Sequence, residues 1–259
     1  MIRDLIKVFL ALLIILGVQT RILGQTKHCL FIGDSYFSHN DLSKEFQAVW
    51  NDEISDTLLI TTHNRDGATI VSQWRRNSNE LLQLFVSQMW DYVIIELPRL
   101  ATPQDSSLVQ IFRKIDSSLK NCRIICITMD FCNSFPEMAC VRDPAEGVKC
   151  NEYLNCKEKS TQVRATSDSI VNQNYKNSIQ IIPFSQYKYF LYDQYLIELG
   201  SDDDYGHPSP FSQSVLARFL LFHIMNHPGQ VDIIKTNKAS SEAIHISSFY
   251  STYNNESNN

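Results

Sequence analysis

The chain has 259 residues, of which 44% are apolar, and a formal charge of −5 at pH 7. This length and apolar content allow one good-sized hydrophobic core, and therefore one α/β domain or at most two small ones. The acidic balance and the lack of any Lys/Arg-rich run exclude a strongly basic nucleic-acid-binding protein, so no nucleic-acid partner is expected.

The first 24 residues predict a signal peptide. The basic residues Arg3 and Lys7 precede eleven uninterrupted apolar or glycine residues, Val8 to Val18. Eleven residues are too short to span a bilayer comfortably but suit the apolar part of an export signal, and Gly24 offers a small residue before the cleavage point. An uncleaved anchor and a buried core helix are the alternatives. We therefore expect a secreted or periplasmic/extracellular protein with no stable membrane span after cleavage.

Short apolar runs rich in β-branched residues alternate with longer segments of helical spacing. Such runs predict strands that are buried on both faces, as in a parallel sheet. The expected strands are 29–33, 56–62, 91–97, 123–129 and 179–184. The expected helices are 42–50, 70–88, 106–119, 158–176 and 212–225. Five alternations indicate a doubly wound α/β domain over residues 25–225, followed by a tail, 226–259.

Four of the seven cysteines lie in an insertion, residues 131–157, after the fourth expected strand. Their spacings of 7, 9 and 5 intervening residues lack the close pairs typical of zinc sites, which makes a metal site the weaker interpretation. In an exported chain we expect two disulfides, with three pairings left open. The disulfide candidates are Cys132, Cys140, Cys150 and Cys156. The other three, Cys29, Cys122 and Cys126, lie in strand-like runs and are expected to be buried thiols.

Ser35 follows the first expected strand in the stretch "FIGDSY", with a helical pattern close behind. Sites in open parallel sheets form at the carboxyl ends of the strands. A serine at a helix start also has backbone N–H groups nearby that can receive an anion. Ser35 is therefore a candidate nucleophile, and a turn or N-cap serine is the alternative.

A nucleophilic serine needs a base, and the base needs an orienting group. Among the seven histidines, His207 stands in a loop, "SDDDYGHPSPFSQ", just ahead of the last expected helix. Asp204 precedes it by three residues, a spacing that lets the carboxylate reach Nδ1 and leaves Nε2 for a serine hydroxyl. Asp202 and Asp203 are adjacent alternatives, and an exposed loop histidine is the other interpretation of His207.

The two motifs "FIGDSY" and "DYGHPS" together resemble the GDSL/SGNH hydrolases, and "RDGATIVSQW" (65–74) resembles the second block of that family. The resemblance covers residues 29 to about 225. It implies a three-layer flavodoxin-like sandwich with a central parallel sheet. It also implies a serine esterase or acylhydrolase with the triad Ser35, His207 and Asp204, and an oxyanion hole from the N–H groups of Ser35 and Gly67. No metal or organic cofactor is implied, and the implied substrate is a small-molecule or glycan ester.

The third block departs from the family pattern. The family usually carries Gly-x-Asn-Asp after the third strand, where the Asn side chain donates to the oxyanion, but this sequence reads "VIIELPRL" with Glu96 near that place. An ionised glutamate only accepts hydrogen bonds and would oppose an oxyanion in the pocket. A protonated Glu96, a positive charge from Arg99, weak or lost activity, and a loop acid without a role remain open. If Glu96 lines the pocket, Glu96→Asn is predicted to raise kcat. The alternative function is a catalytically weak or inactive binding or adaptor module, with the cysteine-rich insertion as its recognition surface.

Overall fold

The computed structural model describes residues 24–97, 106–128, 141–143, 147–149, 175–195, 199 and 207–225. The expected signal peptide up to residue 23, the four disulfide candidates, the C-terminal tail and most of the helix expected at 158–176 lie outside these residues.

The centre of the fold is a five-stranded, all-parallel sheet with the order β2-β1-β3-β4-β7. Its strands are β1 (Thr26–Gly33), β2 (Thr57–Asn64), β3 (Tyr92–Leu97), β4 (Arg123–Thr128) and β7 (Ser178–Ile182). Each coincides with an expected strand to within a few residues, which confirms the predicted parallel α/β sheet. A separate antiparallel pair, β5 (Val141–Asp143) and β6 (Gly147–Lys149), lies inside the cysteine-rich insertion.

The described helices are α2 (Ser35–Ser38), α3 (Leu42–Glu53), α4 (Ile70–Val86), α5 (Ser106–Ser118), α7 (Phe184–Tyr195) and α8 (Pro210–Met225). The helical spacing predicted α3, α4, α5 and α8. It missed α2, which is too short to show a period, and α7, whose many aromatic residues leave no clear polar face. The α4 helix is also interrupted at Asn77, whose backbone is non-helical.

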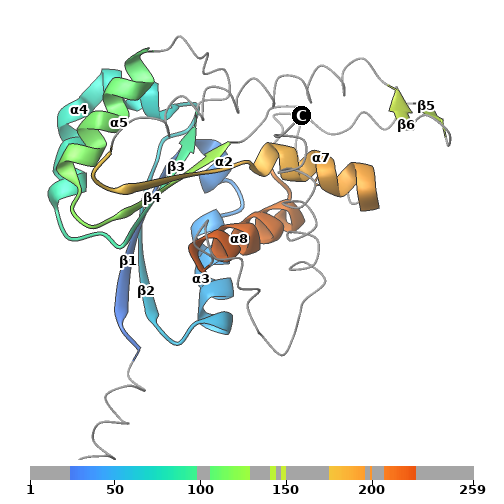
Figure 1. Ribbon diagram of the computed structural model, residues 1–259, viewed down its shortest axis with the longest axis horizontal. Helices are drawn as coiled ribbons and strands as arrows, with labels where there is room; N and C mark the ends of the chain where they lie inside the picture. The colour runs from blue at the N-terminus through green and yellow to red at the C-terminus, as the bar shows by residue number, and fades with distance from the viewer. Residues whose placement is uncertain are drawn as a thin grey trace, which may run out of the picture.

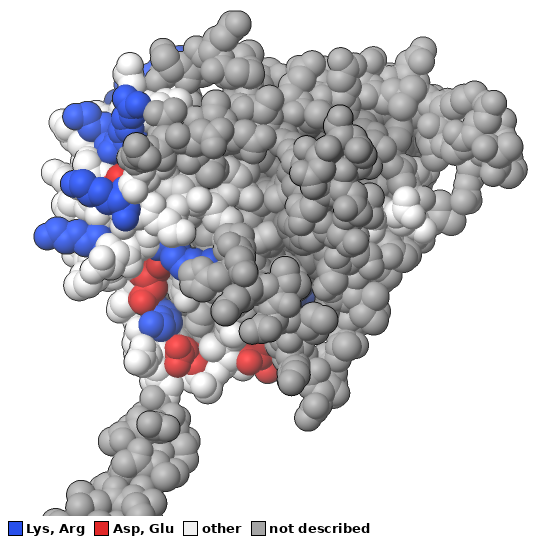
Figure 2. Space-filling model, in the orientation of Figure 1, with Lys and Arg blue, Asp and Glu red and all other residues white. Residues whose placement is uncertain are grey.

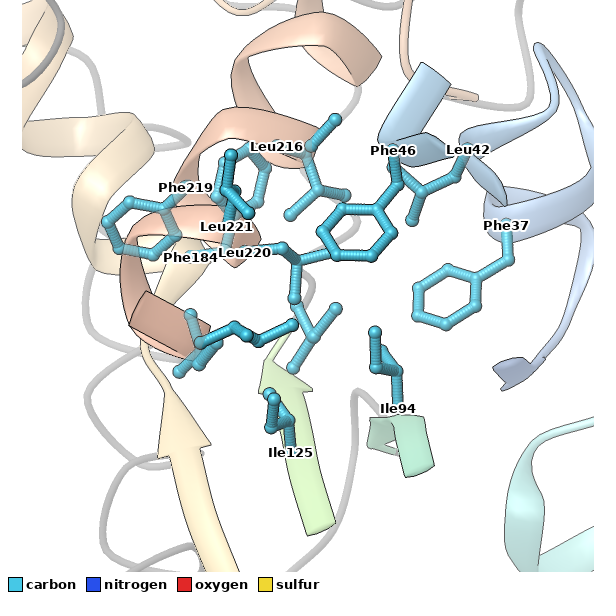
Figure 3. Close-up of a cluster of buried hydrophobic side chains, with 14 of the residues drawn as sticks. Phe37, Leu42, Phe46, Ile94, Ile125, Phe184, Leu216, Phe219, Leu220 and Leu221 are labelled. Carbon is cyan, nitrogen blue, oxygen red and sulfur yellow. The ribbon is translucent and has the colours of Figure 1, made fainter. Parts of the chain in front are cut away.

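Helices cover both faces of the sheet (Figure 1), and the strand period of two decides which face each side chain meets. Leu30 and Ile32 of β1 belong to a buried cluster with residues of α4 and α5. Phe31, between them, belongs to the opposite cluster with residues of α3, α7 and α8. Figure 3 shows this second cluster, in which Phe46 of α3 and Leu216 of α8 face the strand residues Ile94 and Ile125. The predicted three-layer sandwich is thus confirmed.

The start of α8 is fixed by its own sequence. Ser209 Oγ accepts a hydrogen bond from Ser212 N–H at 3.2 Å, and Pro210 is the first helical residue. An N-cap serine followed by proline is a strong helix start, because the serine satisfies a free N–H and proline has none to satisfy. The helix then buries Leu216 and Phe219 completely against the core. His207 therefore lies three residues before the first residue of a firmly placed helix.

Cys29, Cys122 and Cys126 are free and buried, as predicted. Burial raises the pKa of the Cys122 thiol to about 12. The thiol is therefore protonated at neutral pH, and this cysteine acts as a small apolar side chain rather than a nucleophile.

Charges of both signs appear on the surface shown in Figure 2. Within its coloured part, basic side chains gather where α4 and α5 lie, and acidic ones lie nearer the start of β1. The expected lack of a nucleic-acid partner stays a prediction. Of the helices in the described ranges, none combines the length and the apolar content needed to cross a membrane.

Candidate active site

Ser35 lies at the carboxyl end of β1, as the first residue of α2. Asp34 is the N-cap of this short helix, and its Oδ1 accepts a hydrogen bond from Tyr36 N–H at 2.8 Å. The chain passes from β1 to β2 on one side and later to β3 on the other side of β1. Ser35 therefore stands at the point where strand order reverses, the usual place for a site in such a sheet.

His207 packs against α2. Its ring stacks on the ring of His39, with centroids 4.4 Å apart and planes at 12°, and its centroid lies 5.3 Å from that of Tyr36. Tyr36 directly follows Ser35, and His39 is the C-cap of α2. The fold thus brings the predicted base to the helix that begins with the predicted nucleophile.

Two hydrogen bonds hold the His207 segment in this place. Asn40 Nδ2 donates to Pro208 O at 2.8 Å, and Gln213 Nε2 of α8 donates to Tyr36 O at 2.6 Å. Gln213 is 1% exposed. Because both bonds end on backbone carbonyls beside the site, they fix the main chain of α2 relative to the start of α8.

The predicted acid of the triad and one pocket residue are not placed. Asp204, its neighbours Asp202 and Asp203, and Arg99 lie outside the described residues. Within the described part of the chain, Ser35 Oγ makes no hydrogen bond to His207. The direct contact between nucleophile and base therefore stays a prediction, in keeping with the long catalytic hydrogen bonds common in structures without substrate.

Gly67 lies in the loop between β2 and α4 with a φ of +64°. Glycine adopts this left-handed conformation without the strain that a Cβ would cause. No described atom lies within 4 Å of the position that a Cβ would take. The space on the Cβ side of Gly67 is therefore open, and its role as an oxyanion donor stays a prediction.

This loop is tied to the site from two sides. Gln73 Nε2 of α4 donates both to Gly33 O at 2.9 Å and to Ala68 O at 2.7 Å. Ser38 Oγ of α2 donates to Asp66 Oδ1 at 3.0 Å. The bonds of Gln73 join the end of β1 to the residue after Gly67, so the loop and the Ser35 turn are held as one unit.

Glu96 is a buried residue of β3, not a loop acid. It is 4% exposed, and its Oε2 accepts a hydrogen bond from Asp34 N–H at 2.9 Å. The same oxygen lies 2.9 Å from the position that a Cβ on Gly33 would take. Its carboxylate thus supports the turn that carries Ser35. The expected gain from Glu96→Asn is replaced by the opposite expectation, because the shorter side chain would lose this contact.

A polar cavity of about 430 Å³ lies beside α2 at the end of β2. Arg65 Nη2 crosses part of it to both carboxylate oxygens of Glu80, at 2.6 and 2.7 Å. Asn64 Oδ1 is buried and has no hydrogen-bond partner among the described residues. Burial lowers the pKa of His63 from its usual value. The cavity is lined by Ser38, Asp41, Thr62, His63, Asn64, Arg65 and Glu80.

No group of three or more His, Cys, Asp or Glu side chains that could hold a metal occurs in the part of the chain that the structure describes. Whether the protein works without a cofactor stays a prediction.

Sequence reasoning missed the residues that hold the site together: Asn40, Gln73, Gln213 and the stacking role of His39. One signal was available for Gln213. A glutamine within the apolar segment 212–225 has to be buried, and a buried amide needs a partner. Nothing in a single sequence identifies that partner as the carbonyl of Tyr36.

No family model matches the sequence, and no curated protein matches it. Similar solved structures exist. The lipase Lip_vut3 from a goat rumen metagenome is 10% identical, with a TM-score of 0.50, over 76% of this chain and 96% of that chain. The structure of TesA is 13% identical, with a TM-score of 0.46, over 75% of this chain and 96% of that chain. The strand order, the helix layers and the likeness to the lipase agree, and the chain accordingly has the fold of the GDSL/SGNH hydrolases.

Proposed function

We propose that the protein is a serine esterase or acylhydrolase that cleaves an O-acyl ester with Ser35 as nucleophile, His207 as base and Asp204 as orienting acid. One observation carries the proposal. His207, from the far end of the domain, packs on Tyr36 and His39 of the helix that Ser35 begins. A nucleophile type and a base type thus meet at the edge of the sheet where such sites form. The lipase of similar fold adds to this support.

In the proposed reaction, Ser35 Oγ attacks the ester carbonyl carbon while His207 Nε2 takes the hydroxyl proton. Asp204 accepts from Nδ1–H and fixes the tautomer of the ring. The tetrahedral oxyanion is bound by the N–H groups of Ser35 and Gly67. As the intermediate collapses, His207 returns the proton to the alcohol oxygen and the acyl group stays on Ser35. Water, deprotonated by His207, then releases the carboxylic acid and restores the serine.

We infer that the alcohol part of the ester is rich in hydroxyl groups, as in an O-acylated carbohydrate. The support is the polar cavity, whose edge includes Ser38, one turn of α2 after Ser35. Its lining is polar: Arg65 and Glu80 pair with each other there, and the Asp41 carboxylate pairs with Lys44. An apolar chain would take these charged groups out of water without replacing the lost hydration, whereas hydroxyl groups can pair with both acceptors and donors.

We further propose that the chain is exported, that residues 1–24 are removed, and that the insertion carries two disulfides. Closed loops of this length typically add about 2–4 kcal/mol to the free energy of unfolding. Mass spectrometry of the non-reduced, exported protein is expected to show two bridges among the four cysteines of residues 131–157. Four freely alkylated thiols there would contradict both the bridges and the export.

The decisive experiment is hydrolysis of p-nitrophenyl acetate by the wild type, Ser35→Ala and His207→Ala. Each variant is expected to lose at least about 10³-fold in kcat, since removing one member of a triad disables the whole unit. Ser87→Ala is the matched control, because this exposed serine lies at the end of α4, away from the carboxyl edge of the sheet. Equal rates in the wild type and Ser35→Ala would refute the esterase.

A second arm tests the substrate. Acetylated sugars are expected to give a higher kcat/KM than the aryl acetate. Thr62→Val, which removes one hydroxyl from the cavity lining, is expected to lower only the value for sugars. A wild type that hydrolyses neither substrate class but binds glycans would favour the binding module.

A further inference from the structure

We propose that Glu96 is a positioning residue for Ser35, acting as a fixed acceptor for the peptide N–H that precedes it rather than as part of the oxyanion hole. The inference rests on the proposed function, since it assigns how the nucleophile is held. It gives a physical role to Glu96, which stands near the place where the resembled family usually carries an asparagine.

Glu96 holds the N–H end of the peptide group between Gly33 and Asp34. Its Oε2 accepts from Asp34 N–H at 2.9 Å. The carbonyl of the same peptide group, Gly33 O, accepts from Arg65 N–H at 3.0 Å and from Gln73 Nε2 at 2.9 Å. With its donor and its acceptor both engaged, this peptide plane cannot rotate without breaking several buried hydrogen bonds.

The next fixed point lies on the other side of Ser35. Tyr36 N–H donates to Asp34 Oδ1 at 2.8 Å. Two carboxylates thus occupy the N–H groups before and after the serine. The Ser35 N–H lies between them at the first position of α2, where no intrahelical acceptor exists. Among the described contacts it donates to no other group, so it stays available for an oxyanion.

Packing agrees with this assignment. A Cβ on Gly33 would lie 2.9 Å from Glu96 Oε2 and 2.6 Å from Phe37 Cδ2. Glu96 is 4% exposed and Asp34 6%, so neither finds a substitute partner in solvent. The carboxylate therefore fills the space beneath the turn as well as accepting its N–H. An Asn at this position is one methylene shorter, so it would neither fill this space nor accept a hydrogen bond from the Asp34 N–H.

The test compares Glu96→Gln, which keeps an oxygen acceptor and the length, with Glu96→Met, which keeps the bulk but has no oxygen. The first readout is kcat and KM for p-nitrophenyl acetate. Glu96→Met is expected to lower kcat about 5- to 150-fold, the range for a buried group that loses its hydrogen-bond partner, with KM within about twofold. Glu96→Gln is expected to stay within about fivefold of the wild type. Glu53→Gln, an exposed change at the end of α3, is the control.

The second readout is hydrogen exchange at the Asp34 amide, which needs no activity. Exchange is expected to rise at least about tenfold in Glu96→Met and to stay near the wild-type rate in Glu96→Gln. Unchanged exchange in Glu96→Met would overturn the proposal. A loss of kcat in Glu96→Gln as large as in Glu96→Met would also overturn it, because the charge of Glu96 and not its hydrogen-bond acceptor would then matter. A wild type without esterase activity but with a protected Asp34 amide would instead refute the proposed function alone.

If Glu96→Met does not fold, Glu96→Gln still tests the proposal. The proposal requires that Glu96→Gln folds normally, keeps hydrogen exchange at the Asp34 amide near the wild-type rate and keeps kcat within about fivefold of the wild type.

Discussion

Replacing Gly33 by alanine is expected to destabilise the protein through steric overlap at the turn before Ser35. The added Cβ would lie 2.6 and 2.7 Å from Phe37 ring atoms and 2.9 Å from Glu96 Oε2, closer than Cβ atoms pack in proteins. Phe37 is 1% exposed and its ring packs against that of the fully buried Phe31, with centroids 5.8 Å apart, so the ring has little room to shift. Overpacking of this kind typically costs about 1–3 kcal/mol.

For a domain of this size each kcal/mol lowers Tm by about 2–4 °C, so Gly33→Ala should lower Tm by about 2–12 °C in a thermal melt followed by circular dichroism. The double variant Gly33→Ala/Phe37→Leu should lose less than the sum of the two single changes, because the smaller side chain makes room. A Tm for Gly33→Ala within about 1 °C of the wild type would refute the packing described here.

Gly67→Ala is the matched comparison, because its destabilising effect comes from backbone conformation and not from steric overlap. Its φ is +64°, but nothing described lies within 4 Å of a Cβ there. Gly67→Ala is expected to cost about 1–2 kcal/mol, and Gly67→Asn less, since asparagine tolerates the left-handed region. Equal losses for alanine and asparagine would contradict this reading of the loop.

Three further predictions concern titration and the site. Burial lowers the pKa of His223 to about 3, below its unfolded value of about 6.5. The unfolded chain therefore binds one more proton than the folded chain between these values, and the free energy of unfolding falls as pH drops from about 6.5 to 3. Urea unfolding should show that His223→Gln loses part of this slope, at most about 1.4 kcal/mol per pH unit; an unchanged slope would contradict it. His39→Ala should lower kcat about 2- to 10-fold by removing the stack on His207, and a complete loss together with an active His207→Ala would make His39 the base. Asp204→Asn should lower kcat by orders of magnitude in the same ester assay, whereas a nearly unchanged kcat would assign the acid to one of the two preceding aspartates.

The strands β1, β3 and β4 were predictable because each is largely buried on both faces and reads as one continuous apolar run. β2 and β7 lie at the two edges of the sheet and are only partly buried, but they were predictable from their β-branched residues. The helices were predictable where an apolar face repeats over several turns, as in α4 and α5. Neither signal exists for α2, which has one turn, and an aromatic-rich helix such as α7 shows no clear period. In these cases tertiary packing, not local pattern, decides the structure.

The positions of Ser35 and His207 were predictable because each sits in a short motif at an element boundary. The partners of Glu96 and Gln213 were not. Glu96 was expected either in a pocket or in a loop, yet it lies in a strand, with its oxygen on the backbone of the neighbouring turn. Which backbone group a buried polar side chain meets depends on strand register and helix placement, and a single sequence states neither.

The hydrogen bonds from Asn40 to Pro208 and from Gln213 to Tyr36 join residues 168 and 177 positions apart in the chain. During synthesis the first strands can pair long before the segment with His207 has been made, since chains fold from the N-terminus as they emerge. The Ser35 turn would then exist for a time without its base. A proposed hydrolase assembled in this order cannot act on acyl esters inside the producing cell until its last helix docks, and that delay separates its synthesis from its activity.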